Sequence, residues 1–395
     1  MLNTPFSPWP SYTSAEIEKV AEVLASNQVN YWTGEQGRHF ETEFAACTQT
    51  HHAAAVSNGT IALLCAWKAL GIGKGDEVIV PARTYVVSAS SIVLTGATPV
   101  FADVDRESQN ITADAIAKLI TPRTKAICCV HLAGWACDMD ALNDLATSYG
   151  IALLEDCAQA HGATWKGKPV GGLADIAAWS FCQDKIITTG GEGGMVTTQN
   201  EAYWQTVWSY KDHGKSFSAV YEKEHPPGFR WVHESIGING RMPEMQSAIG
   251  RIQLGKLPEW ILARRHNGER ILDAASKLPG LRVSHPPEAV GHAWYRAYVF
   301  IRPEALRSGW SRDRIVDAIN DNGVPCQIGS CSEVYMEKCF SSLGLTPAKR
   351  LPVAQELGET SLMFLVHPTL TDQEVEKTCD ILARVMKQAT QQNAA

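Results

Sequence analysis

The 395-residue sequence predicts an α/β protein with a mostly parallel central sheet sandwiched by helices and a smaller C-terminal α+β unit. Between residues 52 and 198, short apolar segments rich in β-branched residues alternate with amphipathic segments. That alternation is typical of a parallel sheet whose two faces are both covered by helices. After about residue 200 the alternation stops, and a second, shorter pattern follows. We therefore expect a large domain over residues 1–255 and a small domain over residues 256–395.

Two helices are expected before the alternating region. Thr13 and Glu16 form the pattern of a capping box, which predicts a helix that ends near Asn27. A second helix is expected over about Glu35–Cys47, where two phenylalanines four residues apart share one face. The strands expected next are His52–Ser57, Glu77–Pro81, Thr98–Asp103, Lys125–His131, Ile151–Asp156, Ile176–Phe181 and Gly194–Thr197, and the helices between them are Gly59–Leu70, Tyr85–Thr95, Thr112–Leu119 and Asp138–Tyr149.

The C-terminal region is expected to be less regular. The segment Lys211–His233 is polar and contains Pro-Pro-Gly, so it predicts a long loop. A helix from Met242 to Lys256 is expected to continue to about Leu278, with a candidate break near Pro258. The small domain is expected to hold strands Tyr295–Ile301 and Val324–Gln327, helices Ser311–Asn322 and Asp372–Lys387, and a frayed tail over residues 388–395.

Composition excludes several classes of protein. The net charge of -7 argues against a nucleic-acid binder, because no basic stripe is available to neutralise phosphates. The N-terminal segment lacks the pattern of a signal peptide, and no apolar stretch reaches the length of a membrane span. The 11 cysteines include no C-x-x-C, which favours reduced thiols over a metal site or disulfides. We expect a cytoplasmic protein that does not bind membranes.

Two turns after predicted strands carry groups suited to a phosphate and to a heterocycle. Gly59 and Thr60 stand where a strand turns into a helix, and backbone N–H groups at a helix start can bind phosphate. Asp156 ends another strand, where a carboxylate can keep a pyridine nitrogen protonated. Gln159 can reach a hydroxyl on the same ring, whereas Glu155 alternates to the opposite side of the strand. Taken singly, helix caps and surface side chains explain these residues equally well.

Lys185 follows the next apolar strand and precedes a glycine-rich stretch. A single lysine is usually a solvated surface charge. Here it comes after the phosphate-type turn and Asp156, so it predicts an amine that forms a Schiff base. Ser180 could add a hydroxyl to the phosphate site, and Tyr85 could stack on a cofactor ring. Together these groups meet the needs of pyridoxal 5'-phosphate (PLP), with Lys185 as the group that moves a proton at the substrate Cα.

The ordered motifs resemble the DegT/DnrJ/StrS family of sugar aminotransferases, which are PLP enzymes of the aspartate aminotransferase fold (fold type I). The resemblance covers nearly the whole chain. It is carried by the segments YWTGEQGRHFETEFA, SNGTIALLCAWKALGIGKGDEVIVPARTYV, GATPVFADVD, TPRTKAICCVHLAGWACDMD, EDCAQAHGATWKG, SFCQDKIITTGGEGG, GINGRMPEMQSAIGRIQL and VHPTLTDQEV.

The resemblance implies a role for each residue that matches a family motif. Lys185 matches the Schiff-base lysine, Asp156 the partner of the pyridine nitrogen, and Gln159 the residue near the 3-hydroxyl. Tyr85 matches the aromatic residue that stacks on the ring. Asn239 resembles a residue that reaches the phosphate from the neighbouring subunit, which implies a homodimer with shared active sites. Gly59, Thr60 and Ser180 match phosphate contacts, and Trp32, Thr33, Arg241 and Tyr335 are candidate substrate residues.

The activity implied is a ping-pong transamination. Glutamate or glutamine would give its amino group to the cofactor, and the pyridoxamine phosphate formed would aminate a keto sugar, expected to be nucleotide-linked. The product would be an amino sugar for lipopolysaccharide, glycan or antibiotic biosynthesis. Members of the family often carry an H-Y-P-P-L-H-like segment, but here the stretch VPCQIGSCSEVYMEKCF contains no histidine and keeps only the trailing aromatic Tyr335. The sugar, its carbon and its nucleotide therefore stay open.

The sequence is also compatible with three alternative functions. An aminocyclitol aminotransferase acting on a keto-inositol such as scyllo-inosose would use the same motifs. A PLP-dependent sugar dehydratase is disfavoured, because relatives of that kind replace the lysine with histidine, whereas Lys185 is present. A non-catalytic binding or regulatory protein of the same fold is disfavoured by the presence of Lys185, Asp156 and Gln159 together.

Overall fold

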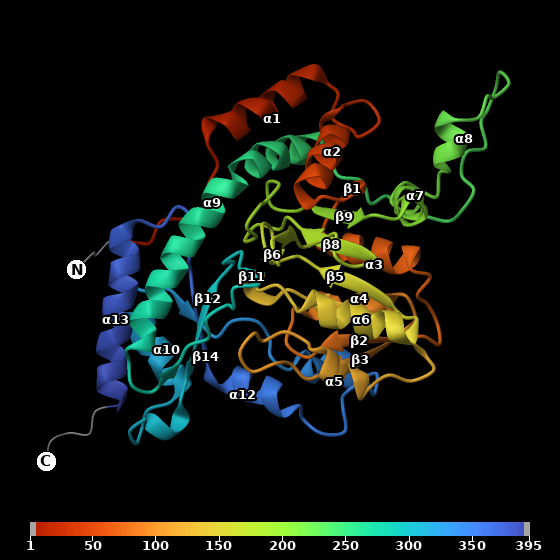
Figure 1. Ribbon diagram of the computed structural model, residues 1–395. Helices are drawn as coiled ribbons and strands as arrows, with labels where there is room; N and C mark the ends of the chain where they lie inside the picture. Colours follow the sequence, from red (N-terminus) through yellow and green to blue (C-terminus); the bar gives the residue numbers. More distant parts are fainter. Residues whose placement is uncertain (1–4, 391–395) are drawn as a thin grey trace, which may run out of the picture.

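The computed structural model describes residues 5–390, and a seven-stranded sheet lies at its centre (Figure 1). The strands are β1 (His52–Val56), β2 (Glu77–Pro81), β3 (Thr98–Ala102), β4 (Thr124–Val130), β5 (Ala152–Asp156), β8 (Ile176–Ser180) and β9 (Gly194–Thr198). Their order across the sheet is β1-β9-β8-β5-β4-β2-β3. Only β9 runs against its neighbours, because it pairs antiparallel with both β1 and β8. The prediction of a mostly parallel sheet is confirmed.

Helices cover both faces of this sheet, as predicted. One face packs on α3 (Gly59–Ala69), α4 (Val86–Leu94) and α7 (Glu201–Tyr210), and the other on α2 (Gln36–Thr48), α5 (Ala113–Ala117), α6 (Met139–Tyr149) and α9 (Glu244–Ser276). Successive strand residues point to opposite faces, so Leu154 enters the core under α3 and Leu153 the core under α6. This alternation also sends the neighbours Glu155 and Asp156 to different sides of β5.

A second, antiparallel sheet forms the C-terminal unit. Its order is β10 (Leu281–Arg282), β12 (Ala297–Ile301), β14 (Ser361–Phe364) and β13 (Cys326–Gln327). The end of α9, α10 (Arg312–Asp321) and α13 (Asp372–Thr390) share a core with this sheet. α9 continues through Pro258, so the candidate break is absent. The expected domain boundary after residue 255 would fall inside α9, and it stays a prediction.

The remaining elements are short, apart from the first helix. α1 (Ser14–Ser26) begins with the predicted capping box of Thr13 and Glu16. Helix α8 (Phe217–Tyr221) lies inside the predicted loop and projects from the side of the molecule (Figure 1). The predicted tail is helical as far as Thr390, and residues 391–395 lie outside the described range. The others are β6 (Thr164–Trp165), β7 (Lys168–Pro169), β11 (Val290–Gly291), α11 (Lys338–Ser341), α12 (Pro352–Thr360) and three 3-10 turns at Leu132–Gly134, Pro303–Ala305 and Val334–Met336.

Over residues 5–390, no helix combines the length and the apolar character needed to cross a lipid bilayer.

Candidate active site

The carboxyl ends of the parallel strands bring the predicted cofactor residues to one edge of the sheet. Asp156 and Ser180 are the last residues of β5 and β8. Gly59 begins α3, shortly after β1, and Tyr85 caps the start of α4, shortly after β2. Ligands of open α/β sheets bind at this edge because the loops leave a crevice there. We call this part of the molecule the carboxyl edge.

Asp156 is buried at the carboxyl edge and held by two donors. Ser88 Oγ donates to Oδ2 at 2.7 Å, and the backbone N–H of Ala158 donates to Oδ1 at 3.1 Å. The hydroxyls of Ser88 and Thr84 lie 2.8 Å apart, so Ser88 is itself oriented by a neighbour. Burial raises the pKa of Asp156, against the opposing effects of these hydrogen bonds and of the charge on Lys185. A carboxylate so placed is suited to bind a cationic ring nitrogen.

Lys185 lies in the turn after β8 with its amine directed into the protein. The indole N–H of Trp9 donates to the backbone carbonyl of Lys185 at 2.9 Å. The Nζ atom lies 5.1 Å from the centre of the Tyr295 ring and 3.9 Å from Oδ1 of Asp184. Burial lowers the pKa of Lys185. The charges of Tyr295, Asp184 and Asp156 raise this pKa by more than burial lowers it, so the pKa lies above its ordinary value. Lys185 and Asp156 are therefore close enough to influence one another's charge.

Gln159 is fixed beside Asp156 by a backbone contact. Its side-chain oxygen accepts a hydrogen bond from the N–H of Ala133 at 2.7 Å. This contact leaves the amide NH₂ group as the donor for a ring oxygen. Ala133 also accepts a hydrogen bond from the N–H of Tyr295 at 2.9 Å, so the same residue connects Gln159 with the segment that covers Lys185.

The start of α3 forms a narrow cradle against Ser180. A Cβ atom at Gly59 would lie 2.8 Å from Cβ of Ser180, and one at Gly194 would lie 2.5 Å from the carbonyl oxygen of Asn58. The Asn58 side chain caps the helix by accepting the N–H of Ile61 at 3.0 Å. The N–H groups of the first helical turn have no partner within the helix, so with the Ser180 hydroxyl they suit a phosphate. These residues fit the phosphate of PLP.

Tyr85 lies at the rim of this edge, where its side chain is 67% exposed. Its ring face is therefore accessible to a ligand or to another protein chain. The predicted role of stacking on the cofactor ring stays a prediction.

A second cluster gathers around the buried carboxylate of Asp212. Trp32 Nε1 donates to Oδ2 at 2.6 Å, Lys215 Nζ lies 3.3 Å from Oδ1, and Arg241 Nη1 donates to the same oxygen. Lys215 Nζ also lies 4.2 Å from the centre of the Trp32 ring. Asn239 forms an isolated backbone bridge with Asp212, and its side chain is exposed. The structure thus brings Trp32, Arg241 and Asn239 together, around a residue that sequence reasoning missed.

Two further candidate substrate residues occupy different surroundings. Thr33 is part of an exposed turn and donates its hydroxyl to the carbonyl of Asn30 at 3.2 Å. Tyr335 is fully buried, its ring packs 5.7 Å from that of Phe101, and its hydroxyl accepts the N–H of Leu351 at 2.9 Å. These contacts support a packing role for Tyr335, so its predicted contact with substrate gains no support from them.

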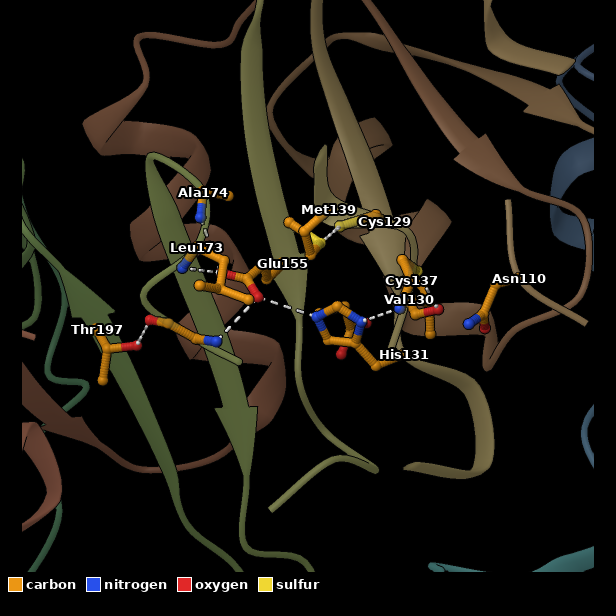
Figure 2. Close-up of polar contacts among 12 residues, drawn as sticks. Asn110, Cys129, Val130, His131, Cys137, Met139, Glu155, Leu173, Ala174 and Thr197 are labelled. Carbon is orange, nitrogen blue, oxygen red and sulfur yellow. Dashed lines mark hydrogen bonds and ion pairs between the residues drawn. The ribbon is translucent and has the colours of Figure 1, made fainter. Parts of the chain in front are cut away.

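A buried network around Glu155 and His131 is drawn in Figure 2. Because successive side chains of a strand alternate, this network lies on the opposite side of β5 from Asp156. His131 Nε2 lies 3.0 Å from Glu155 Oε2, and the N–H of Cys137 donates to Nδ1 at 3.0 Å, so the ring proton is assigned to Nε2. Glu155 also accepts the backbone N–H groups of Gly171, Leu173 and Ala174 at 2.9, 2.9 and 3.0 Å. Cys157 places a third metal-type ligand nearby. N–H donors already use the carboxylate oxygens, which favours a structural network over a metal site.

Sequence reasoning missed several residues that touch the predicted site. Asp184 could have been noticed, because it directly precedes Lys185. Ser88 lies three residues after Tyr85, one helical turn into α4, which is a weak signal. Tyr295 and Trp9 carry no local signal, because they are far from Lys185 in sequence and meet it only in the fold.

Known proteins match this chain over almost its whole length. The sequence model of the DegT/DnrJ/EryC1/StrS aminotransferase family matches residues 10–383. GDP-perosamine synthase of Escherichia coli O157:H7 is 34% identical over 374 residues, which are 94% of this chain and 95% of that protein. The structure of an aminotransferase from Psychrobacter cryohalolentis is 55% identical with a TM-score of 0.96, covering 98% of this chain and 100% of that one.

A third relative connects the fold with its cofactor. Spr1654 of Streptococcus pneumoniae, described as a candidate sugar aminotransferase, has been solved in a PLP form and a PMP form. The PLP form has a TM-score of 0.86 at 25% identity, covering 98% of this chain and 99% of that one. The predicted fold and cofactor are confirmed by these matches. The chain belongs to the DegT/DnrJ/EryC1/StrS aminotransferase family, and it is a PLP-dependent aminotransferase.

Proposed function

We propose that this aminotransferase moves an amino group from glutamate or glutamine to a nucleotide-linked keto sugar in amino-sugar biosynthesis. The observation that carries the proposal is the meeting of Lys185, Asp156 and the Gly59–Ser180 cradle at one edge of the sheet. Support for a nucleotide-linked sugar comes from the 34% identity with a protein named GDP-perosamine synthase.

Each residue at the carboxyl edge would have its own role in binding the cofactor or in catalysis. PLP, when bound, supplies an electron sink that stabilises negative charge at the substrate Cα. The start of α3 and Ser180 would bind its phosphate, Asp156 its ring nitrogen and Gln159 its ring hydroxyl. Lys185 would hold it covalently and, once released, move the proton at the substrate Cα. The burial of Asp156 and the low exposure of Lys185, whose side chain is 15% accessible, would limit the access of water to this proton transfer.

We further propose that the active enzyme is a homodimer with shared active sites. We call residues 212–236 the arm; they include α8 and project from the body of the protein (Figure 1). The arm exposes large apolar side chains, with Trp231 81% and Ile236 90% accessible. Such a patch is typical of a surface that another chain covers. Because Trp32, Arg241 and Asn239 gather at the base of the arm, a second chain covering it would contact two candidate substrate residues and Asn239, which resembles a residue that reaches the phosphate of the neighbouring subunit.

The predicted cytoplasmic location remains part of this proposal. All 11 cysteines are free thiols, which accords with a reducing compartment.

The sharpest test is to load the enzyme with pyridoxamine phosphate and to offer 3-keto and 4-keto nucleotide sugars and scyllo-inosose separately. Return of the absorbance of the lysine-bound cofactor with one nucleotide sugar would support the proposal. A response to scyllo-inosose alone would replace it with an aminocyclitol aminotransferase. Failure of borohydride to trap cofactor on Lys185, or full turnover by Lys185→Ala, would refute the role of this lysine.

A further inference from the structure

The amine of Lys185 has two carboxylates near it, in contrasting surroundings. Asp156 is buried, whereas the side chain of Asp184 is 52% exposed. Burial raises the pKa of Asp156. Burial acts in the same direction on Asp184, but the charge of Lys185, a hydrogen bond from Tyr295 and the charge of Arg296 outweigh it and lower the pKa of Asp184. Carboxyl groups whose surroundings move their pKa values in opposite directions are suited to different roles.

One oxygen of the Asp184 carboxylate is held by neighbouring side chains, and the other oxygen faces the amine of Lys185. Its Oδ2 atom accepts the Tyr295 hydroxyl and lies 3.7 Å from Arg296 Nη2. Its Oδ1 atom lies 3.9 Å from Lys185 Nζ. The Tyr295 ring is flanked by both cations, since Lys185 Nζ and Arg296 Cζ lie 5.1 and 4.3 Å from its centre. The two oxygens of one carboxylate therefore have separate partners.

We propose that Asp184 is a catalytic residue that holds the amine of Lys185 whenever this amine is not bonded to the cofactor. Tyr295 and Arg296 are positioning residues that act through Asp184. In the proton transfer, the C–H bond at the substrate Cα breaks, an N–H bond forms on Lys185, and the electron pair passes to the cofactor. Asp184 stabilises the ammonium group formed and keeps it in reach for its return. This inference rests on the proposed role of Lys185.

Asp156 is less suited to this task. Ser88 and Ala158 each occupy one of its oxygens, and its proposed partner is the ring nitrogen. Asp184 stays ionised and keeps one oxygen toward the amine. The other charged or titratable groups around Lys185 are Tyr295 and Cys182, which act on its pKa, and His161, whose pKa of about 3 leaves it neutral at neutral pH.

The first test measures the holoenzyme. In the half-reaction with glutamate, Asp184→Asn should lower kcat about tenfold and leave KM nearly unchanged, because the lost contact is made by the released amine and not by substrate. The acidic limb of the kcat profile should move to lower pH, because the released amine takes up the proton in its neutral form and a less stabilised ammonium group loses its proton at lower pH. Tyr295→Phe keeps the ring under Lys185 but removes the donor to Asp184, so it should give a smaller change in the same direction. An unchanged kcat and pH profile in Asp184→Asn would overturn the proposal.

The second test reads the amine directly, by competitive acetylation of the full chain with and without PLP and mass spectrometry of the Lys185 peptide. Without PLP, Asp184→Asn should lower the pKa of Lys185 and raise its labelling about three- to tenfold at a pH below that pKa. Asp140→Asn is the matched control, because this side chain is 56% exposed and pairs with Lys166. It should leave labelling of Lys185 unchanged.

The acetylation test distinguishes a failure of the proposed role of Lys185 from a failure of the proposed role of Asp184. If PLP fails to protect Lys185 from acetylation in the unsubstituted protein, the proposed role of Lys185 falls. If PLP protects Lys185 but Asp184→Asn labels like the unsubstituted protein, only the role of Asp184 falls. Thermal melts of both variants show whether the fold is kept.

Discussion

The carboxyl edge and the arm differ in whether their side chains find contact partners within the same chain. At the carboxyl edge, Asp156 and Gln159 are buried and each has its hydrogen-bond partner within the chain. In the arm, Trp231 and Ile236 are almost fully accessible, although the base of the arm is fixed through Asp212. The difference indicates that the fold of one chain positions the groups proposed for cofactor chemistry at the carboxyl edge, with the exception of Asn239, which resembles a phosphate contact from the neighbouring subunit. Under the homodimer proposal, the candidate substrate residues depend on the second chain that covers the arm.

The largest expected effect tests the carboxyl edge. Lys185→Ala should lower kcat by about 10²–10⁴, because the group that moves the proton is lost. Lys215→Ala removes a lysine at the base of the arm and should keep covalent cofactor binding, which borohydride trapping measures. Comparable loss of trapping in both variants would contradict the separation of the two regions.

Removing Glu155 from the buried network that it forms with His131 should lower the stability of the protein. Glu155→Ala leaves His131 and three backbone N–H groups without their buried acceptor, so it should lower the free energy of unfolding by about 3–5 kcal/mol. Urea denaturation measures this difference. Glu22→Ala removes an exposed carboxylate 2.7 Å from Lys19 and should cost less than about 1 kcal/mol. Equal losses would show that the network contributes no more than a surface pair.

Lowering the pH should reduce the stability of the folded protein, because His161 takes up a proton more readily in the unfolded chain. Burial lowers its pKa to about 3, and its ring packs 5.3 Å from that of Trp179. The folded pKa lies below the ordinary value of 6.5, so the unfolded chain binds more protons between pH 6.5 and 3. Stability is therefore complete above pH 6.5 and falls as the pH is lowered through this window, by about 2 kcal/mol at pH 5 for this residue.

The check is His161→Phe, which keeps an aromatic ring and cannot take up the proton. Urea denaturation at pH 7 and pH 5 should show a loss of stability on acidification that is about 2 kcal/mol smaller than in the unsubstituted protein. If the acid-induced loss is the same in both proteins, His161 is not the group that takes up this proton.

The smallest expected effect concerns the arm. Trp231→Ala should raise the dissociation constant of the homodimer at least about tenfold, because exposed aromatic residues often dominate interfaces. Analytical ultracentrifugation over a concentration series measures it. Tyr149→Ala, at the exposed end of α6, is the control and should leave dimerisation unchanged. A monomeric unsubstituted protein would refute the shared-site proposal outright.

Local sequence patterns were sufficient for the central sheet and for the core of the candidate site. Asp156 and Ser180 end apolar strands, and Gly59 starts a helix, so their positions follow from the rule that parallel strands share a carboxyl edge. The same patterns failed where packing overrides local preference. α9 continues through Pro258, and α8 forms inside a polar segment that predicted a loop.

The sequence by itself determined the alternating strands and helices of the central sheet, the residues at the carboxyl edge and, through its family motifs, the cofactor. Only the tertiary structure decided that the Tyr295 ring lies under the Lys185 amine, that Trp9 donates to the Lys185 carbonyl and that Asp212 joins Trp32 to Arg241. The reason is physical. Periodicity and capping act within a few residues, whereas these contacts join segments far apart in sequence and form only when the helices and sheets pack.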